Sequence, residues 1–304
     1  MIATYRHKNL EWVDLGSPTD EDIRQVFEKY ALPETAAEEL LRPSIQSKAK
    51  RYDNCLYLTL HFPTRRTGSV ARESREIDFC IGKNFLITSH AAEMPNIHEF
   101  TKLFEVNSMI GASEPFEHGG HLFYHLMKHL YSSLILEVDT ASARLGEIEN
   151  NVFAGKEREM VISLSEMSRM MLDFKRTIRP QASALESLIL TSKNFFGDDF
   201  GPHFKSILSE AAGAYENITG NLESVRELRD TTAVLVTTKQ NEVIKILTAG
   251  VLIGVPLTVT VTLFQMESVS RPIIGRPGDF WIMVIILAII TLGILAIFKF
   301  KKWL

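Results

Sequence analysis

Polar side chains recur on one face of the long apolar stretch near the C-terminus. These polar side chains and several bulky apolar ones are spaced three or four residues apart, so they share one face of a helix. The polar members are Asn241, Thr248, Thr258 and Thr262; the apolar members are Ile244, Val251 and Val255, with Leu247 on a neighbouring face. Threonine hydroxyls can donate and accept hydrogen bonds to a hydrated ion without carrying charge, and apolar rings can close a path by excluding water. The alternative is that each threonine only bonds the carbonyl four residues earlier in its own helix.

Two carboxylates stand at the ends of this stretch. Glu267 follows directly where the first apolar run stops. Asp230 lies eleven residues before Asn241, three helical turns away on nearly the same face. Carboxylates at such positions concentrate cations. For Asp230 the alternative is an ordinary solvated side chain beside Arg226 or Arg229.

The densest group of histidines is a second candidate for chemistry. It comprises His118, His121, His125 and His129, and the last three are spaced i, i+4, i+8 on one helix face. Two imidazoles at this spacing can share a Zn²⁺, Co²⁺ or Ni²⁺ ion if a third ligand arrives. Because no carboxylate or cysteine sits at an obvious completing position, the alternative is a polar helix face that holds no metal.

Two apolar runs must position the polar face. Residues 246–266 and residues 280–298 are each long enough to cross a hydrocarbon core of about 30 Å as a helix. The loop 267–279 joins them into a hairpin, so both ends lie on one side. Lysines precede the first run, and three more lie in the tail 299–304. Because positively charged residues favour the cytoplasmic side, the sequence predicts a multi-pass protein of the inner (cytoplasmic) membrane with both termini cytoplasmic.

The chain before the membrane runs divides by its periodicity. Residues 1–115 mix strand and helix signals, including Thr19 and Asp22 at capping-box spacing, and predict a cytoplasmic α/β domain. Residues 116–202 predict an antiparallel helical pair. Residues 203–245 predict a stalk helix that continues into the first membrane span.

Composition and missing motifs exclude several classes of function. A net charge of -4 is too small to indicate a nucleic-acid partner. The sequence has no glycine-rich phosphate loop, catalytic triad or CxxC pair, so we expect no enzyme, no ATP-driven transport and no bound cofactor. Cys55 and Cys80, both in expected strands, have the default role of packing in a reducing compartment.

The order and spacing of these features resemble the CorA family of divalent-cation transporters over nearly the whole chain. The residues that carry the resemblance are "NEVIKILT" at 241–248, "PLT" at 256–258 and the final "KKWL" at 301–304. The resemblance implies an α+β cytoplasmic domain followed by long helices and a two-helix C-terminal transmembrane hairpin. It also implies a homopentameric funnel in the lipid bilayer, acting as a passive channel or transporter for Mg²⁺, Co²⁺, Ni²⁺ or Zn²⁺.

The resemblance also assigns expected roles to residues. In the family a Gly-Met-Asn signature after the first span forms the outer mouth of the pore, and Gln265, Met266 and Glu267 correspond to it here, so only the methionine is retained. An acidic stalk residue that helps the family sense Mg²⁺ corresponds to Ser206. Feedback is therefore expected to be weak or absent unless Glu210, Asp198 or Asp199 substitutes for it. The expected pore residues are Asp230, Asn241, Ile244, Leu247, Thr248, Val251, Val255, Thr258, Thr262, Gln265, Met266 and Glu267, with Glu267 and Asp230 contacting metal. The altered signature leaves open an alternative, a non-conducting protein with a structural or regulatory role.

Overall fold

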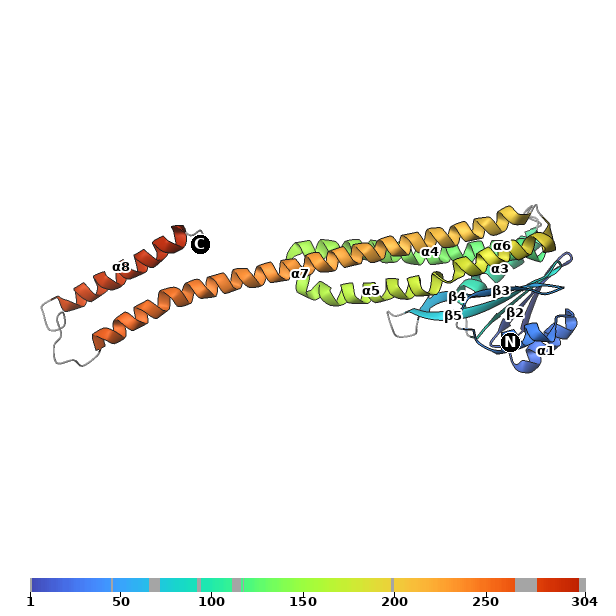
Figure 1. Cartoon of the computed structure of the whole chain (residues 1–304), viewed down its shortest axis with the longest axis horizontal. Helices are drawn as coiled ribbons and strands as arrows, with labels where there is room; N and C mark the ends of the chain where they lie inside the picture. Colours follow the sequence, from blue (N-terminus) through green and yellow to red (C-terminus); the bar gives the residue numbers. More distant parts are fainter. Residues whose placement is uncertain are drawn as a thin grey trace. The chain divides into compact units, whose positions relative to one another are not determined.

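The computed structural model describes residues 2–44, 46–65, 72–91, 94–110, 116, 118–197, 200–265 and 278–300 (Figure 1). The chain divides into two compact units, Met1–Asp230 and Thr231–Leu304. Helix α7 (Gly201–Gln265) begins in the first unit and ends in the second.

The first unit is built on a six-stranded sheet in the order β1-β2-β6-β5-β4-β3. The strands are β1 (Ile2–His7), β2 (Leu10–Gly16), β3 (Lys48–Arg51), β4 (Leu56–Arg65), β5 (Arg72–Ile81) and β6 (Phe85–His90). Neighbouring strands are antiparallel except β2 and β6, which run parallel. The mixed sheet, with helices on both faces, is the α+β fold that the sequence pattern predicted.

One face of the sheet is covered by helices α1 (Asp20–Lys29) and α2 (Glu34–Leu41). Alternation along β2 sends Val13 and Leu15 into this core, which also contains Cys55 and Cys80. Both cysteines are buried and free. Cys80 lies in β5 as predicted, whereas Cys55 directly precedes β4 instead of lying within it.

The predicted capping box at the start of α1 is confirmed. The Thr19 hydroxyl accepts a hydrogen bond from the Asp22 N–H at 3.2 Å, and the Asp22 carboxylate accepts one from the Thr19 N–H at 3.0 Å. The bond from the Thr19 backbone N–H, with a smaller contribution from the Thr19 side chain, favours the charged carboxylate and lowers the pKa of Asp22.

The opposite face of the sheet is covered by helices α3 (Pro95–Ile110) and α4 (Gly119–Asn151) and by two further helices. Trp12 of β2 packs edge-on against Phe104 of α3, with ring centroids 5.8 Å apart. Phe79 of β5 packs edge-on against Phe123 of α4 at 5.3 Å. These aromatic contacts fix the N-terminal part of α4 over the middle of the sheet.

Helix α4 reverses direction through a short π-helical turn, η1 (Val152–Lys156), into α5 (Glu157–Ile178). Gly155 makes the reversal with φ of 91°, a left-handed conformation that favours glycine. Pro180 then caps α6 (Gln181–Phe196), which packs on β3 and β4. Residues 119–196 therefore form three helices, α4, α5 and α6, with the η1 reversal between the first two.

Within the first unit, the initial part of α7 buries one face at helical spacing. Its buried members are Phe204, Ile207, Ala211, Ala214, Ile218, Leu222 and Val225. Phe204 lies 5.9 Å from Phe123 of α4, centroid to centroid, which connects α7 to the same aromatic core.

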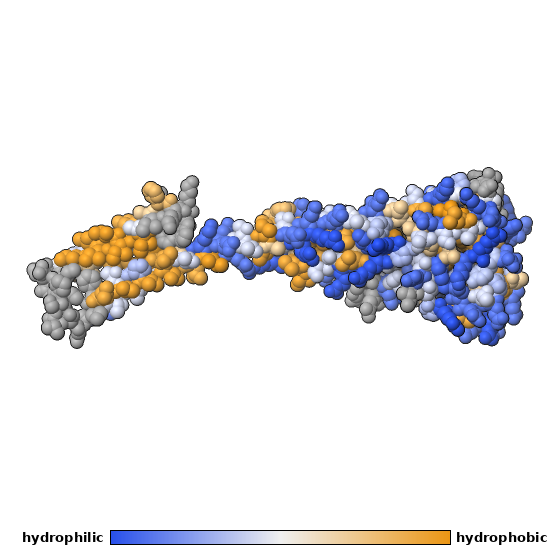
Figure 2. All heavy atoms as spheres, in the orientation of Figure 1, coloured by the Kyte–Doolittle hydropathy of each residue, from blue (hydrophilic) through white to orange (hydrophobic). Residues whose placement is uncertain are grey.

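The second unit contains the remainder of α7 and helix α8 (Asp279–Phe300), drawn antiparallel in Figure 1. Among the described residues, one helix is long and apolar enough to cross a membrane, and it is α7. The apolar stretch Phe280–Ile294 of α8 is shorter. Figure 2 shows apolar side chains over both helices of this unit.

Candidate functional site

The predicted polar face is an exposed stripe on the second-unit part of α7. We define the exposed stripe by its members, Asn241, Ile244, Thr248, Val251, Val255, Thr258 and Thr262. At about 100° per residue, these positions fall within a sector of about 100° around the helix. The bulky apolar members are open to the surroundings: Ile244 is 58% exposed and Val255 is 55% exposed. Leu247, on the neighbouring face, is 67% exposed.

The other side of the same helix segment is partly covered. Its half-buried members are Ile253, Pro256, Leu257 and Thr260. Helix α8 has a matching row at helical spacing, consisting of Met283, Ile286, Leu287, Ile290 and Ile294. Complementary half-buried rows are the pattern of two helices that pack against each other. The exposed stripe therefore points away from α8, which leaves it available to other copies or to a lumen.

The threonines of the stripe bond their own helix. The Thr258 hydroxyl donates to the Gly254 carbonyl at 2.9 Å, and the Thr262 hydroxyl donates to the Thr258 carbonyl at 2.7 Å. This is the local bonding that was the alternative to an ion-contacting role. A hydroxyl that donates its proton still has lone pairs that accept hydrogen bonds. Because the water molecules around a metal cation donate outward, such hydroxyls remain suited to a hydrated cation.

Asp230 has the environment of a surface carboxylate. It lies on α7 at the end of the first unit and is highly exposed. The Arg229 Nε lies 4.0 Å from its Oδ1, at the limit of an ion pair. Exposed pairs of this kind contribute little to stability. The Asp230 carboxylate is thus accessible to cations, and Arg229 competes with them only weakly.

The residues that correspond to the family signature are only partly described. Gln265 is the last residue of α7, and its side chain is exposed. Met266 and Glu267 lie outside the described residues. Ser206 lies in the first three turns of α7 and is half buried.

The structure surrounds the histidines of the hypothesised metal site with aromatic rings. His125 packs edge-on against Phe116, and His129 lies 5.5 Å from Phe100 between ring centroids. His121 stacks on His118 at 4.2 Å. Within the described ranges, no group of three histidine, cysteine, aspartate or glutamate side chains is arranged to hold a metal ion.

A different grouping, not apparent from the spacing, combines His118, His121 and His203, and we call it the His118 cluster. His203 comes from the first turn of α7, and its ring lies 5.3 Å from that of His121. Burial, together with smaller contributions from the His121 and His203 imidazoles, lowers the pKa of His118 to about 4. His118 also caps α4, because its Nδ1 accepts the Gly120 N–H at 3.0 Å.

We expect the His118 cluster to make the first unit acid-sensitive. The pKa of His118 is lower in the folded chain than the ordinary value of 6.5, so the unfolded chain binds a proton first as the pH falls. Stability from this group is complete above about pH 6.5 and is lost as the pH falls towards 4. His118→Asn retains a good capping side chain but does not titrate. The unfolding temperature of the variant, measured between pH 4 and pH 7, should therefore depend less on pH than that of the parent.

The control for this prediction is His98→Asn on α3. His98 is exposed and is not part of the cluster. It should leave the acid sensitivity unchanged. Equal acid sensitivity of the parent and His118→Asn would show that His118 is not the responsible group.

Comparison with known families decides where this chain belongs. A family model described as "CorA-like Mg2+ transporter protein" matches residues 7–302. The chain belongs to the CorA family. Because this is a family of ion transporters, the chain is not an enzyme, as the missing catalytic motifs predicted.

Relatives of this CorA-family chain match it over nearly its full length. It is 20% identical to the cobalt/magnesium transport protein CorA of Thermotoga maritima, over 96% of this chain and 83% of that protein. The complete structure of the CorA magnesium transporter from Methanocaldococcus jannaschii is similar with a TM-score of 0.84 at 17% identity, covering 99% of this chain and 94% of that one. The ZntB cytoplasmic domain from Vibrio parahaemolyticus is similar with a TM-score of 0.62 at 16% identity, covering 75% of this chain and 88% of that one. At these identities the structures establish the fold.

Proposed function

We propose that five copies of this CorA-family chain form a passive pathway for divalent cations across the cytoplasmic (inner) membrane. The observation that carries the proposal is the exposed stripe, which faces away from α8 and alternates hydroxyl and amide groups with bulky apolar side chains. Around a common axis, such stripes form rings of polar groups that can contact water, separated by rings of apolar side chains that exclude it. The relatives named as cobalt and magnesium transport proteins support a cation as the cargo.

The proposed path begins at the residues that follow the first span. A ring of Glu267 recruits cations outside, the threonine rings accept hydrogen bonds from their hydration shells, and Asp230 attracts them at the cytoplasmic end. Ile244, Leu247 and Val251 form the gate, because bulky apolar rings close a pore by dewetting. A membrane potential favours inward movement by about 2.3 kcal/mol per charge per 100 mV, so no coupled energy source is needed.

The topology in this proposal places residues 246–266 and 280–298 in the membrane, with the loop 267–279 outside. The basic tail 299–304 and the first unit then both lie in the cytoplasm. Mg²⁺, Co²⁺, Ni²⁺ and Zn²⁺ are the candidate ions. Ser206, in place of an acidic stalk residue, makes feedback by cytoplasmic Mg²⁺ weak or absent.

Uptake into proteoliposomes tests the proposal. Purified full-length protein, reconstituted with an inward-negative potential, should take up at least one of these four ions, and empty liposomes provide the control. If none of the four ions enters under a gradient, the pathway does not exist. The chain would then be the non-conducting family member that the altered Gln265 and Glu267 positions suggest.

The double substitution Gln265→Gly with Glu267→Asn tests what the altered signature does. A ring of carboxylates attracts cations but discriminates poorly among them, whereas neutral amides can order a hydration shell. We expect the double variant to raise Mg²⁺ uptake relative to Co²⁺ uptake by roughly tenfold or more, the effect of one good hydrogen bond. Initial rates for both ions in the same proteoliposomes give the ratio. If the ratio of Mg²⁺ uptake to Co²⁺ uptake were unchanged, residues 265 and 267 would not contribute to ion selectivity.

A further inference from the structure

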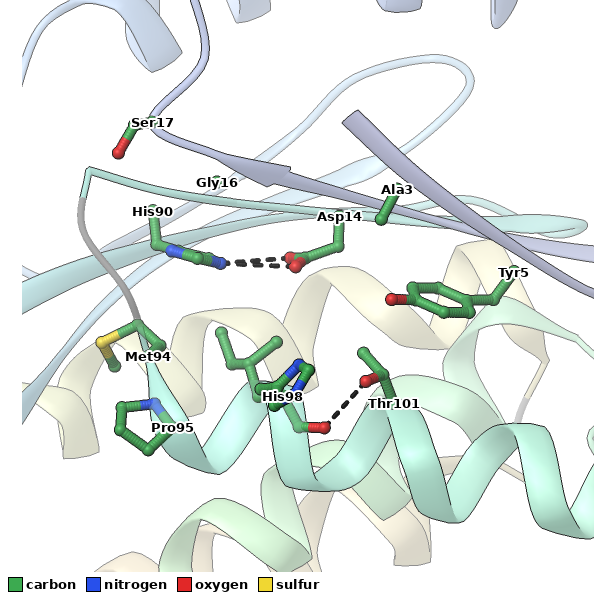
Figure 3. A pocket seen from close by; sticks show the side chains of 11 residues that line it. Ala3, Tyr5, Asp14, Gly16, Ser17, His90, Met94, Pro95, His98 and Thr101 are labelled. Carbon is green, nitrogen blue, oxygen red and sulfur yellow. Dashed lines mark hydrogen bonds and ion pairs between the residues drawn. The ribbon is translucent and has the colours of Figure 1, made fainter. Parts of the chain in front are cut away.

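A cavity of about 670 Å³ lies in the first unit between the sheet and the start of α3. Figure 3 shows its walls: β1, β2 and β6 on one side and the first turns of α3 on the other. Asp14 and His90 project into it from β2 and β6, and Tyr5 and His98 border it. A concave site of this size, with a few convergent polar groups, is suited to a small organic ligand.

The polar groups of this cavity present acceptors. The Ser17 hydroxyl donates to the Ala91 carbonyl at 2.7 Å, and the Thr101 hydroxyl donates to the His98 carbonyl at 2.8 Å. Both hydroxyls thus use their protons on the backbone and offer lone pairs to a ligand. The Asp14 carboxylate, when ionised, is also an acceptor only. A ligand that supplies hydrogen-bond donors is therefore complementary to these three groups, although the Tyr5 hydroxyl and the histidine rings can also donate.

The Asp14 carboxylate is fixed in position but only loosely paired. Its Oδ1 accepts the Thr88 hydroxyl at 2.5 Å, and Thr88 in turn accepts the Trp12 indole N–H at 3.0 Å. The His90 Nε2 lies 3.3 Å from Oδ1 and 3.4 Å from Oδ2. Charge-assisted bonds of this type are normally about 2.7–2.9 Å long. The carboxylate therefore retains capacity for a stronger donor from inside the cavity.

The remaining walls favour a ligand with an apolar body. Ala3, Met94 and Ile97 contribute apolar surface, and the Tyr5 ring offers a face to a cation. No lysine or arginine is among the described residues that line the cavity, and an ionised Asp14 would repel a phosphate or carboxylate ligand. We propose that this cavity binds a small organic cation. Its ammonium or amidinium group contacts Asp14, and its hydrocarbon or aromatic body lies against the apolar wall.

The test compares two probes of the same shape and different charge. Benzamidine carries an amidinium on an aromatic ring, whereas benzamide is its neutral counterpart. Ligand-observed NMR with the detergent-solubilised full-length protein should detect binding of benzamidine and at least tenfold weaker binding of benzamide. Asp14→Asn should weaken benzamidine binding by tenfold or more. Asp139→Asn, an equal change of charge at an exposed position of α4, should not.

A second variant separates loss of the site from loss of the fold. Ala3 is directly opposite Asp14 in the β1–β2 ladder, so Ala3→Leu fills the cavity beside the carboxylate without changing its charge. It should abolish benzamidine binding while the unfolding temperature stays close to that of the parent. Equal binding of the two probes, or benzamidine binding that survives in both variants, would overturn the proposal. Displacement of benzamidine by Mg²⁺ at equal concentration would also overturn it, by assigning the carboxylate to a hydrated metal ion.

Discussion

Replacing Gly119 with alanine is expected to destabilise the first unit strongly, because the added methyl group would collide with backbone atoms. A Cβ at this position would lie 2.3 Å from the Gly82 carbonyl oxygen and 2.3 Å from the Phe85 carbonyl oxygen. Both oxygens are backbone atoms, one in the β5–β6 turn and one at the start of β6, and backbone cannot rotate away as a long side chain can. The Gly119 N–H also donates to the Lys83 carbonyl at 2.8 Å, so helix and turn are bonded at the point of closest approach.

The expected cost is about 3 kcal/mol, at the upper end of the usual range for overpacking a core. For a unit of this size, that corresponds to a fall of roughly 6–12 °C in unfolding temperature. Thermal unfolding of the full-length protein in detergent, followed by circular dichroism, measures it. The first unit should lose its native structure before the helices of the second unit unfold.

Gly146→Ala in the same helix is the matched control. A Cβ at Gly146 meets nothing within 4 Å in this chain, so only the better helix propensity of alanine remains. We expect this variant to be as stable as the parent or up to about 1 kcal/mol more stable. If Gly119→Ala had the same unfolding temperature as Gly146→Ala, α4 would not be in close contact with the turn between β5 and β6.

Much of this fold could be predicted from the sequence, because the interactions that form its helix caps and long helices involve residues that are close in sequence. The capping box at Thr19 and the continuous run of α7 past residue 203 depend on neighbours in sequence. The short edge strand β3 and helix α3 were not predicted. β3 has the charged sequence KAKR and lacks an apolar alternation, and its identity comes from pairing with β4. The need for glycine at position 119 is equally non-local, since it arises from a turn more than thirty residues earlier.

In the candidate sites too, the sequence predicts features that depend on neighbouring residues but not contacts between distant segments. Periodicity predicted which residues share the exposed stripe, but only the half-buried rows on α7 and α8 show which side of the helix is covered. The histidine spacing correctly placed His121, His125 and His129 on one helix, yet their partners come from other elements, including His203. Asp14 and His90 are distant in sequence and meet because β2 and β6 are parallel neighbours. The sequence signal that could have found Asp14 is a carboxylate flanked by the apolar residues Val13 and Leu15 of one strand.

The largest effect on transport is expected from Thr258→Val combined with Thr262→Val. Valine has nearly the shape of threonine but cannot accept a hydrogen bond from a hydration shell. Each lost hydrogen bond raises the energy of the passing ion by about 1 kcal/mol, and a ring removes several at once. In the proposed pore, the initial rate of divalent-cation uptake should therefore fall by roughly tenfold or more. Uptake into proteoliposomes containing equal amounts of each protein gives the comparison.

Thr260→Val makes this experiment decisive, because Thr260 makes the same bond within its own helix as the other two threonines. Its hydroxyl also donates to the carbonyl four residues earlier, that of Pro256, at 2.7 Å. It differs in lying on the half-buried side of α7, opposite the exposed stripe. We expect Thr260→Val to transport at the rate of the parent. Equal loss in the double variant and in Thr260→Val would mean that the hydroxyls act only within their own helix. Parental activity in both variants would place the ion path elsewhere. A loss confined to Thr258 and Thr262 would identify the exposed stripe as the surface that the ion meets.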